Sequence, residues 1–351
     1  MYREHFGLVR DPFNVTPDPA FLYLSRSHQE ALAQLVYGVK SRKGFVVLTG
    51  EVGTGKTTLL HALLHELNGN AQTAFIFNTI ANQKDLLRTV CEDFRLTAPE
   101  TEAKEIHDYI SLLNRFLLES YQKGGNCVLI IDEAQNLSAE VLDSVRLLSN
   151  FETAEDKLLQ ILMVGQPELS ARLNAPQLRQ VKQRVALRHN LRPLTLTECI
   201  EYVGRRLEIA GGTPSIFTGA ALRTIYAYSG GTPRVINILC DNSMLTAYAL
   251  NRKRVEEYMI REVAEDLSLP VPESIRRTTV EAAIKRGRAI EEPSGTEKRR
   301  RWLGTAAWSL AAVLMLGALY WASDWNRTEN LDPAKLVDFL KSIYEEIKTS
   351  L

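Results

Sequence analysis

The sequence predicts a three-layer α/β domain with a parallel sheet, followed by an all-helical lid, a linker and one transmembrane helix. Short apolar runs alternate with amphipathic segments from residue 44 to residue 195, and only helical patterns continue from there to residue 267. The transmembrane helix is predicted from an uncharged run of 21 residues, 302–322. At the helical rise such a run spans about 32 Å, which is enough for a bilayer core.

The α/β domain is predicted over residues 1–195. Each predicted strand is a nearly continuous apolar run, as expected for strands that are buried on both faces. The four strands are expected at Phe45–Thr49, Thr73–Asn78, Cys127–Asp132 and Leu158–Val164. Helices with one apolar face are expected at Thr57–Leu67, Gln83–Phe94, Ile106–Gln122 and Ser138–Phe151. This alternation is typical of βαβ units that build a parallel sheet.

The helical lid is predicted over residues 196–268. Four helical patterns are expected there, at Thr197–Ala210, Thr218–Ser229, Thr232–Leu250 and Val255–Leu267. Two turns of sequence GlyGlyThrPro, at 211–214 and 230–233, separate them. Each turn places Thr and Pro where a helix start favours a capping side chain and a fixed φ.

The C-terminal part is predicted as a basic linker, 269–301, the transmembrane helix 302–322 and a short tail, 323–351. From residue 270 to residue 301 there are nine Lys or Arg against five Glu, although the whole chain balances 42 basic with 42 acidic residues. Four consecutive basic residues, 298–301, precede the apolar run and predict that the N-terminal part is cytoplasmic. The tail is then periplasmic, and its amphipathic pattern fits a helix that docks on a partner or lies on the membrane surface.

A phosphate-binding motif follows the first predicted strand. Residues 50–57 fit GxxxxGK[ST], between a strand and a helix as the motif requires. Glycines let backbone N–H groups turn toward phosphate oxygens, where the helix N-terminus adds partial positive charge. We expect Lys56 to hold the β- and γ-phosphates of ATP and the Thr57 hydroxyl to bind Mg²⁺. The expected nucleotide-binding residues are Gly50, Glu51, Val52, Gly53, Thr54, Gly55, Lys56, Thr57 and Thr58.

A pair of acids follows the third predicted strand. Asp132 and Glu133 come directly after the apolar run Val128–Ile131. At the carboxyl end of a strand the first carboxylate can bind Mg²⁺, and the second can polarise the attacking water. Together with the phosphate motif upstream, the pair predicts Asp132 as a metal ligand and Glu133 as the general base of ATP hydrolysis.

Several further motifs resemble those of the AAA+ ATPases of the ExeA, or general secretion pathway protein A, family. The resemblance covers about residues 1–268. Its motifs are HisPheGlyLeu at 5–8, AspProPhe at 11–13, ThrProAspProAlaPheLeuTyr at 16–23, SerArgSerHisGlnGluAlaLeu at 25–32, the phosphate motif, IleIleAspGluAlaGln at 130–135, ValGlyGlnProGluLeu at 164–169 and GlyThrProArg at 231–234.

The resemblance implies roles for three more residues. Gln166 matches a position that senses the γ-phosphate and positions water, and Arg234 is similar to a lid arginine that reaches the same phosphate. The basic run 179–192 matches the region from which an AAA+ subunit inserts an arginine into its neighbour's site. Arg184 fits that role best and Arg188 second. Other interpretations are a turn amide for Gln166, a surface arginine for Arg234, and a solvated or nucleic-acid-binding face for the basic run.

The resemblance also implies a location and partners. Such proteins are cytoplasmic ATPases that are tethered to the inner membrane of Gram-negative bacteria, form rings and assist assembly of the type II secretion secretin. Similar ATPases serve exopolysaccharide export with protein sorting, or pilus biogenesis. Transposition-helper ATPases form an alternative of another class, but the membrane helix and the neutral net charge argue against a nucleic-acid partner. A nucleotide-bound scaffold without hydrolysis is a third alternative, but the intact motifs around Lys56, Asp132 and Glu133 argue against it.

Longer family members carry a periplasmic peptidoglycan-binding domain, whereas 29 residues follow the apolar run here, so we expect no direct peptidoglycan binding.

Overall fold

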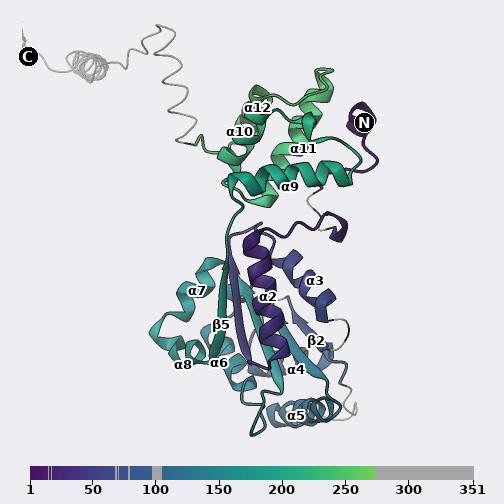
Figure 1. Ribbon diagram of the computed structural model, residues 1–351. Coiled ribbons are helices and arrows are strands. Elements are labelled where there is room, and N and C mark those ends of the chain that lie inside the picture. Colours follow the sequence, from purple (N-terminus) through teal and green to yellow (C-terminus); the bar gives the residue numbers. More distant parts are fainter. Residues whose placement is uncertain are drawn as a thin grey trace, which may run out of the picture. The chain divides into compact units, whose positions relative to one another are not determined.

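A five-stranded parallel sheet forms the centre of the α/β domain (Figure 1). The computed structural model describes residues 1–272 except 15, 17, 68, 70, 78, 79 and 97–104. The strands are β1 Phe45–Gly50, β2 Ala71–Ile76, β3 Asn126–Ile131, β4 Leu159–Gly165 and β5 Val185–Leu191. Their order across the sheet is β2-β3-β4-β1-β5, and every neighbouring pair is parallel. The first four strands confirm the predicted ones to within two residues at either end.

The fifth strand was not predicted, because neither a helix nor a strand was assigned to the basic run 179–192. The run instead holds a short helix, α8 (Arg179–Arg184), and then β5. This strand lies at an edge of the sheet, and its residues alternate between half-buried and exposed until Leu191 is buried. This strand lacks the continuous apolar run by which the other four were recognised, because polar residues such as Arg188 and Asn190 occupy its exposed positions.

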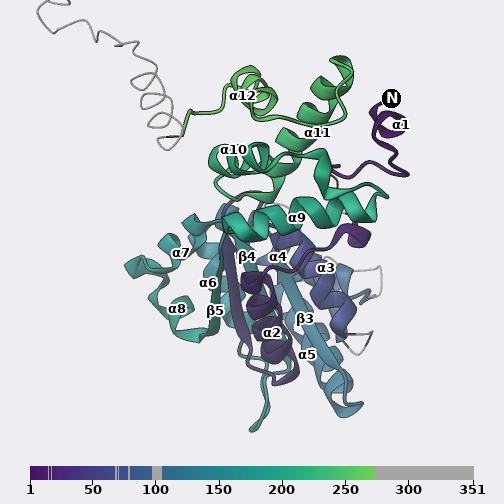
Figure 2. The ribbon, with the colours of Figure 1, turned by 45° about the horizontal axis from the view of Figure 1, so that its top comes forward.

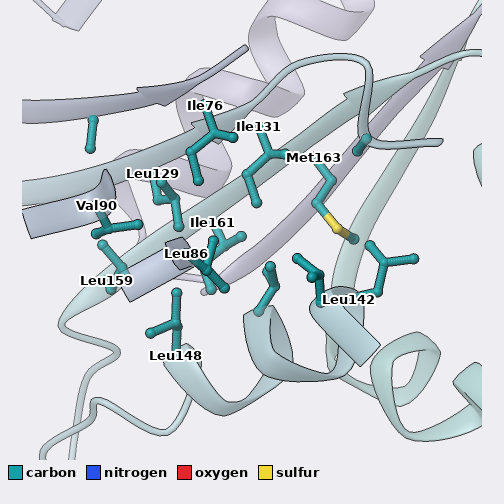
Figure 3. Close-up of a cluster of buried hydrophobic side chains, with 14 of the residues drawn as sticks. Ile76, Leu86, Val90, Leu129, Ile131, Leu142, Leu148, Leu159, Ile161 and Met163 are labelled. Atoms are coloured by element: carbon teal, nitrogen blue, oxygen red, sulfur yellow. The ribbon is translucent and has the colours of Figure 1, made fainter. Parts of the chain in front are cut away.

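Helices cover both faces of the sheet, so the three predicted layers are confirmed. The helices α2 (Arg26–Lys40) and α3 (Lys56–Leu67) pack on one face, where they bury Val46 and Leu48. The opposite face carries α4 (Gln83–Asp93), α5 (Ile106–Gln122), α6 (Ala139–Leu148), α7 (Pro167–Leu173) and α8. Figure 3 shows part of that second core, in which side chains of β2, β3 and β4 meet those of α4 and α6. Alternate strand residues reach opposite faces, as the pleat requires.

Four helices form the lid, as predicted: α9 (Leu196–Ile209), α10 (Gly219–Ser229), α11 (Pro233–Ala249) and α12 (Glu257–Asp266) (Figure 2). The short helix α1 (Tyr2–Phe6) and the segment that follows it pack on the lid. Leu8, Phe13 and Phe21 belong to the hydrophobic cluster of the lid helices. The segment before α2 therefore packs on the lid: α1 contacts α11, and the turn Pro19–Phe21 contacts α9.

The linker beyond residue 272, the predicted transmembrane helix 302–322 and the tail 323–351 lie outside the described residues. Within the part that the structure describes, no helix is both long and apolar enough to cross a membrane.

Candidate nucleotide-binding site

A cavity of about 390 Å³ lies where the phosphate motif, the start of α2 and the lid meet. The order of strands explains its position. In the sheet β1 has β4 and β5 as neighbours, and β3 follows β4, so the residues after β1, β3 and β4 emerge at the same edge. Thr49, near the end of β1, pairs with Gly165 of β4 and Asn190 of β5. The phosphate motif after β1, the acid pair after β3 and the motif 164–169 at the end of β4 are thereby brought to one edge of the sheet.

The phosphate motif forms a tight loop between β1 and α3. Gly53 and Gly55 have φ of 77° and 100°, a region that residues with a side chain rarely adopt. Lys56, which begins α3, is 7% exposed, and its Nζ donates to the carbonyls of Gly50 at 2.8 Å and Glu51 at 3.1 Å. Burial lowers the pKa of Lys56, and the charges of Glu133 and Asp132 oppose that shift. Lys56 is therefore a buried cation whose Nζ donates to two backbone carbonyls. Phosphate oxygens would be stronger acceptors and could take the place of these carbonyls.

The acid Asp132 faces the phosphate motif from the end of β3. Its Oδ2 lies 3.5 Å from the Thr57 hydroxyl, and its Oδ1 accepts the backbone N–H of Glu133 at 2.9 Å. Burial raises the pKa of Asp132, although the N–H of Glu133 and the charge of Lys56 act in the opposite direction. A hydroxyl and a carboxylate that converge in this way suit Mg²⁺, which takes oxygen ligands and usually adds phosphate and water oxygens to one or two protein ligands.

The neighbouring acid Glu133 is held in a defined orientation. Its backbone has φ 50° and ψ 37°, a left-handed conformation that costs about 1–3 kcal/mol for a residue with a side chain. Its Oε2 accepts hydrogen bonds from the side-chain amides of Gln135 and, at 3.2 Å, Gln166. Burial alone would raise the pKa of Glu133, but the hydrogen bonds from these two amides and the charge of Lys56 together lower it. Glu133 is therefore ionised at neutral pH, which is the form that can accept a proton.

The two glutamines belong to one small network. Gln166 precedes α7, whose first residue is Pro167, and its backbone N–H donates to Gln135 Oε1 at 3.0 Å. The structure thus places Gln166 beside Glu133, as its predicted role beside the attacking water would require. Gln135 was missed as a site residue, although it stands two positions after Glu133 in the motif 130–135.

The lid side of the cavity contains residues that no motif assigned to the site. Arg206 of α9 is 6% exposed and donates to Tyr202 Oη at 2.7 Å and to the Asn14 carbonyl at 3.3 Å. Its guanidinium also lies 4.8 Å from the centre of the Phe21 ring. All four residues line the cavity, so the segment before α2 supplies one wall of the site. An arginine on the buried face of an amphipathic helix is the signal that could have pointed to it.

Comparison with known proteins agrees with this geometry. A family model described as AAA domain matches residues 39–173. Over 321 residues the chain is 38% identical to general secretion pathway protein A of Aeromonas hydrophila, and the match covers 92% of this chain and 54% of that protein. The resemblance to the AAA+ ATPases of the general secretion pathway protein A family is thereby confirmed. It spans about half the length of this relative.

Two further likenesses are more distant. An uncharacterized HTH-type transcriptional regulator of Methanocaldococcus jannaschii is 26% identical over 177 residues, which cover 48% of this chain and 42% of that protein. The structure of the Aeropyrum pernix ORC2 protein in ADPNP and ADP complexes superposes with a TM-score of 0.53 and 19% identity, over 73% of this chain and 71% of that chain. The second likeness shows that the AAA+ fold is shared, and nothing about activity.

The two arginines that the family resemblance singled out lie in different places in this AAA+ chain. Arg234, in the first turn of α11, lines the cavity, and its backbone N–H donates to the Gly53 carbonyl at 3.3 Å. The side chain of Arg184, at the end of α8, is exposed and donates to Asn150 Oδ1 at 3.2 Å. Among the described residues, those that line the cavity include Arg234 but not Arg184. The role of Arg184 in the site of a neighbouring subunit stays a prediction.

Proposed function

We propose that the chain binds ATP with Mg²⁺ in this cavity and hydrolyses it. The observation that carries the proposal is the convergence of Lys56 and Thr57, at the start of α3, with Asp132 and Glu133, after β3, on one edge of the sheet. Thr57 and Asp132 would hold Mg²⁺, which neutralises charge on the phosphates when bound. A site with only some of these four residues could bind a nucleotide without hydrolysing it.

Each of the residues at the cavity has a distinct role in the proposed reaction. Lys56 exchanges its two loop carbonyls for phosphate oxygens and stabilises their negative charge. Glu133 accepts a proton from the attacking water, since its carboxylate is ionised and oriented. Gln166 holds that carboxylate and orients the water, while Arg234 contributes a positive charge from the lid.

We also propose that the ATPase domain is cytoplasmic and is tethered to the inner membrane by residues 302–322. Its work would be to assist assembly of a bacterial envelope export machine, the type II secretion secretin in the first place. The similarity to general secretion pathway protein A supports this pathway. The uncharged run and the four basic residues before it support the tether and its orientation. Export of exopolysaccharide and pilus biogenesis are the alternatives within the same class.

A nucleic-acid-binding regulator is the alternative of another class. The weaker likeness to a transcriptional regulator and the basic residues of α8 and β5 favour it. The equal numbers of basic and acidic residues in the whole chain oppose it, because nucleic-acid binding draws on an excess of positive charge.

A test in the native host separates these pathways. The wild-type chain should sediment with the inner membrane, and a chain that lacks residues 302–322 should not. Cells that carry Glu133→Gln in place of the wild type should lose most of their secretin multimers, measured by immunoblotting without heat denaturation. Normal multimers together with lost pili or lost exopolysaccharide would transfer the function to one of the alternative pathways.

A further inference from the structure

We propose that His28 is a positioning residue of the phosphate-binding loop. Its ring holds the carbonyl of Thr54 so that the next backbone N–H, that of Gly55, faces the phosphate site. The inference rests on the proposed nucleotide binding and adds to it a residue on α2 that lies outside the phosphate motif.

The ring of His28 lies against the phosphate-binding loop. His28 lies in the first turn of α2 and is 5% exposed. Its Nε2 is 3.0 Å from the Thr54 carbonyl oxygen, and its Nδ1 is 2.6 Å from Ser25 Oγ. Both ring nitrogens therefore have a partner, and one of the two partners is the backbone of the phosphate loop.

The partners also decide where the ring proton lies. A carbonyl oxygen only accepts, so Nε2 must carry the hydrogen and donate it to Thr54. In the neutral ring Nδ1 is then an acceptor, and the Ser25 hydroxyl donates to it. Burial lowers the pKa of His28, which agrees with a neutral ring at physiological pH.

Because the peptide bond is planar, the hydrogen bond to the Thr54 carbonyl also sets the direction of the Gly55 N–H. In a planar trans peptide the carbonyl oxygen of one residue and the N–H of the next point in opposite directions. A hydrogen bond that fixes the Thr54 carbonyl toward α2 therefore turns the Gly55 N–H away from α2. The ring also packs closely against Gly55, because a Cβ placed on this glycine would lie 3.0 Å from His28 Nε2. Gly55 has φ 100° and is free to rotate unless a neighbour holds it.

The ring is itself anchored by the first turn of α2. Ser25 caps this helix by accepting the backbone N–H of His28 at 3.4 Å. The backbone N–H of Arg26 donates to Glu198 of the lid helix α9 at 3.1 Å, and Ser27 Oγ accepts the backbone N–H of Arg192 at 3.2 Å. Three consecutive residues, 26–28, thus connect to the lid, to the chain after β5 and to the phosphate loop, so His28 holds the loop from a fixed support.

Two amide variants of His28 in the full-length chain test this inference. The amide nitrogen of Gln in His28→Gln can reach the position of the ring Nε2, whereas the shorter Asn in His28→Asn reaches only the position of Nδ1. We expect His28→Gln to bind ADP and ATP within about twofold of the wild type. We expect His28→Asn to bind both about tenfold more weakly, which corresponds to about 1.4 kcal/mol. Calorimetric titration measures the affinities, and thermal unfolding without nucleotide shows whether the two variants fold equally well.

The outcomes separate this inference from the proposed function. If the wild type itself binds neither ADP nor ATP, the proposed function fails before the variants are compared. If the wild type binds and His28→Asn binds equally well, or His28→Gln binds as weakly as His28→Asn, the role of the Nε2 hydrogen bond is refuted. Should neither variant fold, Ser25→Ala decides, because it keeps His28 but removes the hydroxyl that orients its ring. ADP affinity in Ser25→Ala should fall about threefold, and an unchanged affinity would overturn the proposal.

Discussion

Glu133→Gln should slow ATP hydrolysis by about 100- to 10,000-fold, the range that a general base contributes. The amide cannot accept the proton that the attacking water loses. ATP binding should stay within a few fold of the wild type, because Lys56 and the phosphate loop are unchanged. Release of phosphate measures turnover, and titration with ATP measures binding.

The control for this variant is Glu140→Gln, which removes an exposed carboxylate from the first turn of α6. It makes the same chemical change away from the cavity and should leave the turnover rate unchanged. If Glu133→Gln turned over ATP as fast as Glu140→Gln, Glu133 would not be the base, and the catalytic assignment would have to pass to another group.

Arg184→Ala should reduce ATP hydrolysis by about 1,000-fold or more if Arg184 completes the site of a neighbouring subunit. The side chain lies at the end of α8 with Asn150 as its partner, so its removal leaves the cavity of its own subunit intact. Turnover by the wild type should also rise faster than linearly with protein concentration, because the active site forms only on assembly. Arg188→Ala, a change of the same kind on β5, tests the second candidate.

Mixing two inactive variants distinguishes a residue that acts in a neighbour from one that acts in its own subunit. Arg184→Ala keeps Glu133, and Glu133→Gln keeps Arg184, so a mixed ring contains sites with both groups. Part of the activity should return on mixing. A wild-type rate in Arg184→Ala, or an absence of recovery after subunit exchange has been verified, would contradict the assignment of Arg184.

The buried parts of the fold could be predicted because burial imposes simple patterns. Strands β1, β3 and β4 are buried along most of their length and appear as continuous apolar runs. The lid helices were recognisable because each buries one face, and three of them, α9, α10 and α11, start at a capping residue or a proline. Strand β5 escaped recognition because Arg188, His189 and Asn190 interrupt its apolar residues, and helix α2 escaped because no strand signal precedes it. The segment before α2 packs on lid helices almost 200 positions later, a contact that no local pattern encodes.

The candidate site likewise contains residues that could be predicted from the sequence and residues that could not. Lys56, Thr57, Asp132 and Glu133 lie in motifs whose spacing reflects their chemistry, and the structure brings them together. His28 lies in the motif at 25–32, which by itself indicates no role, and Arg206 lies in no motif. Each acts through a contact that exists only after folding, His28 with the Thr54 carbonyl and Arg206 with the Asn14 carbonyl. Backbone carbonyls are identical in every residue, so a sequence cannot show which of them a side chain will meet.

The central claim is that ATP with Mg²⁺ occupies the cavity at the phosphate loop. Titration of the full-length wild type and of Lys56→Ala with ATP in the presence of Mg²⁺ tests it most directly. Loss of the charge-assisted hydrogen bonds from Lys56 should weaken binding by about 10- to 150-fold. Lys123→Ala, which removes an exposed lysine at the end of α5, should bind like the wild type, and chelation of Mg²⁺ should abolish turnover by the wild type. Equal ATP affinities in Lys56→Ala, Lys123→Ala and the wild type would show that nucleotide does not bind at this loop.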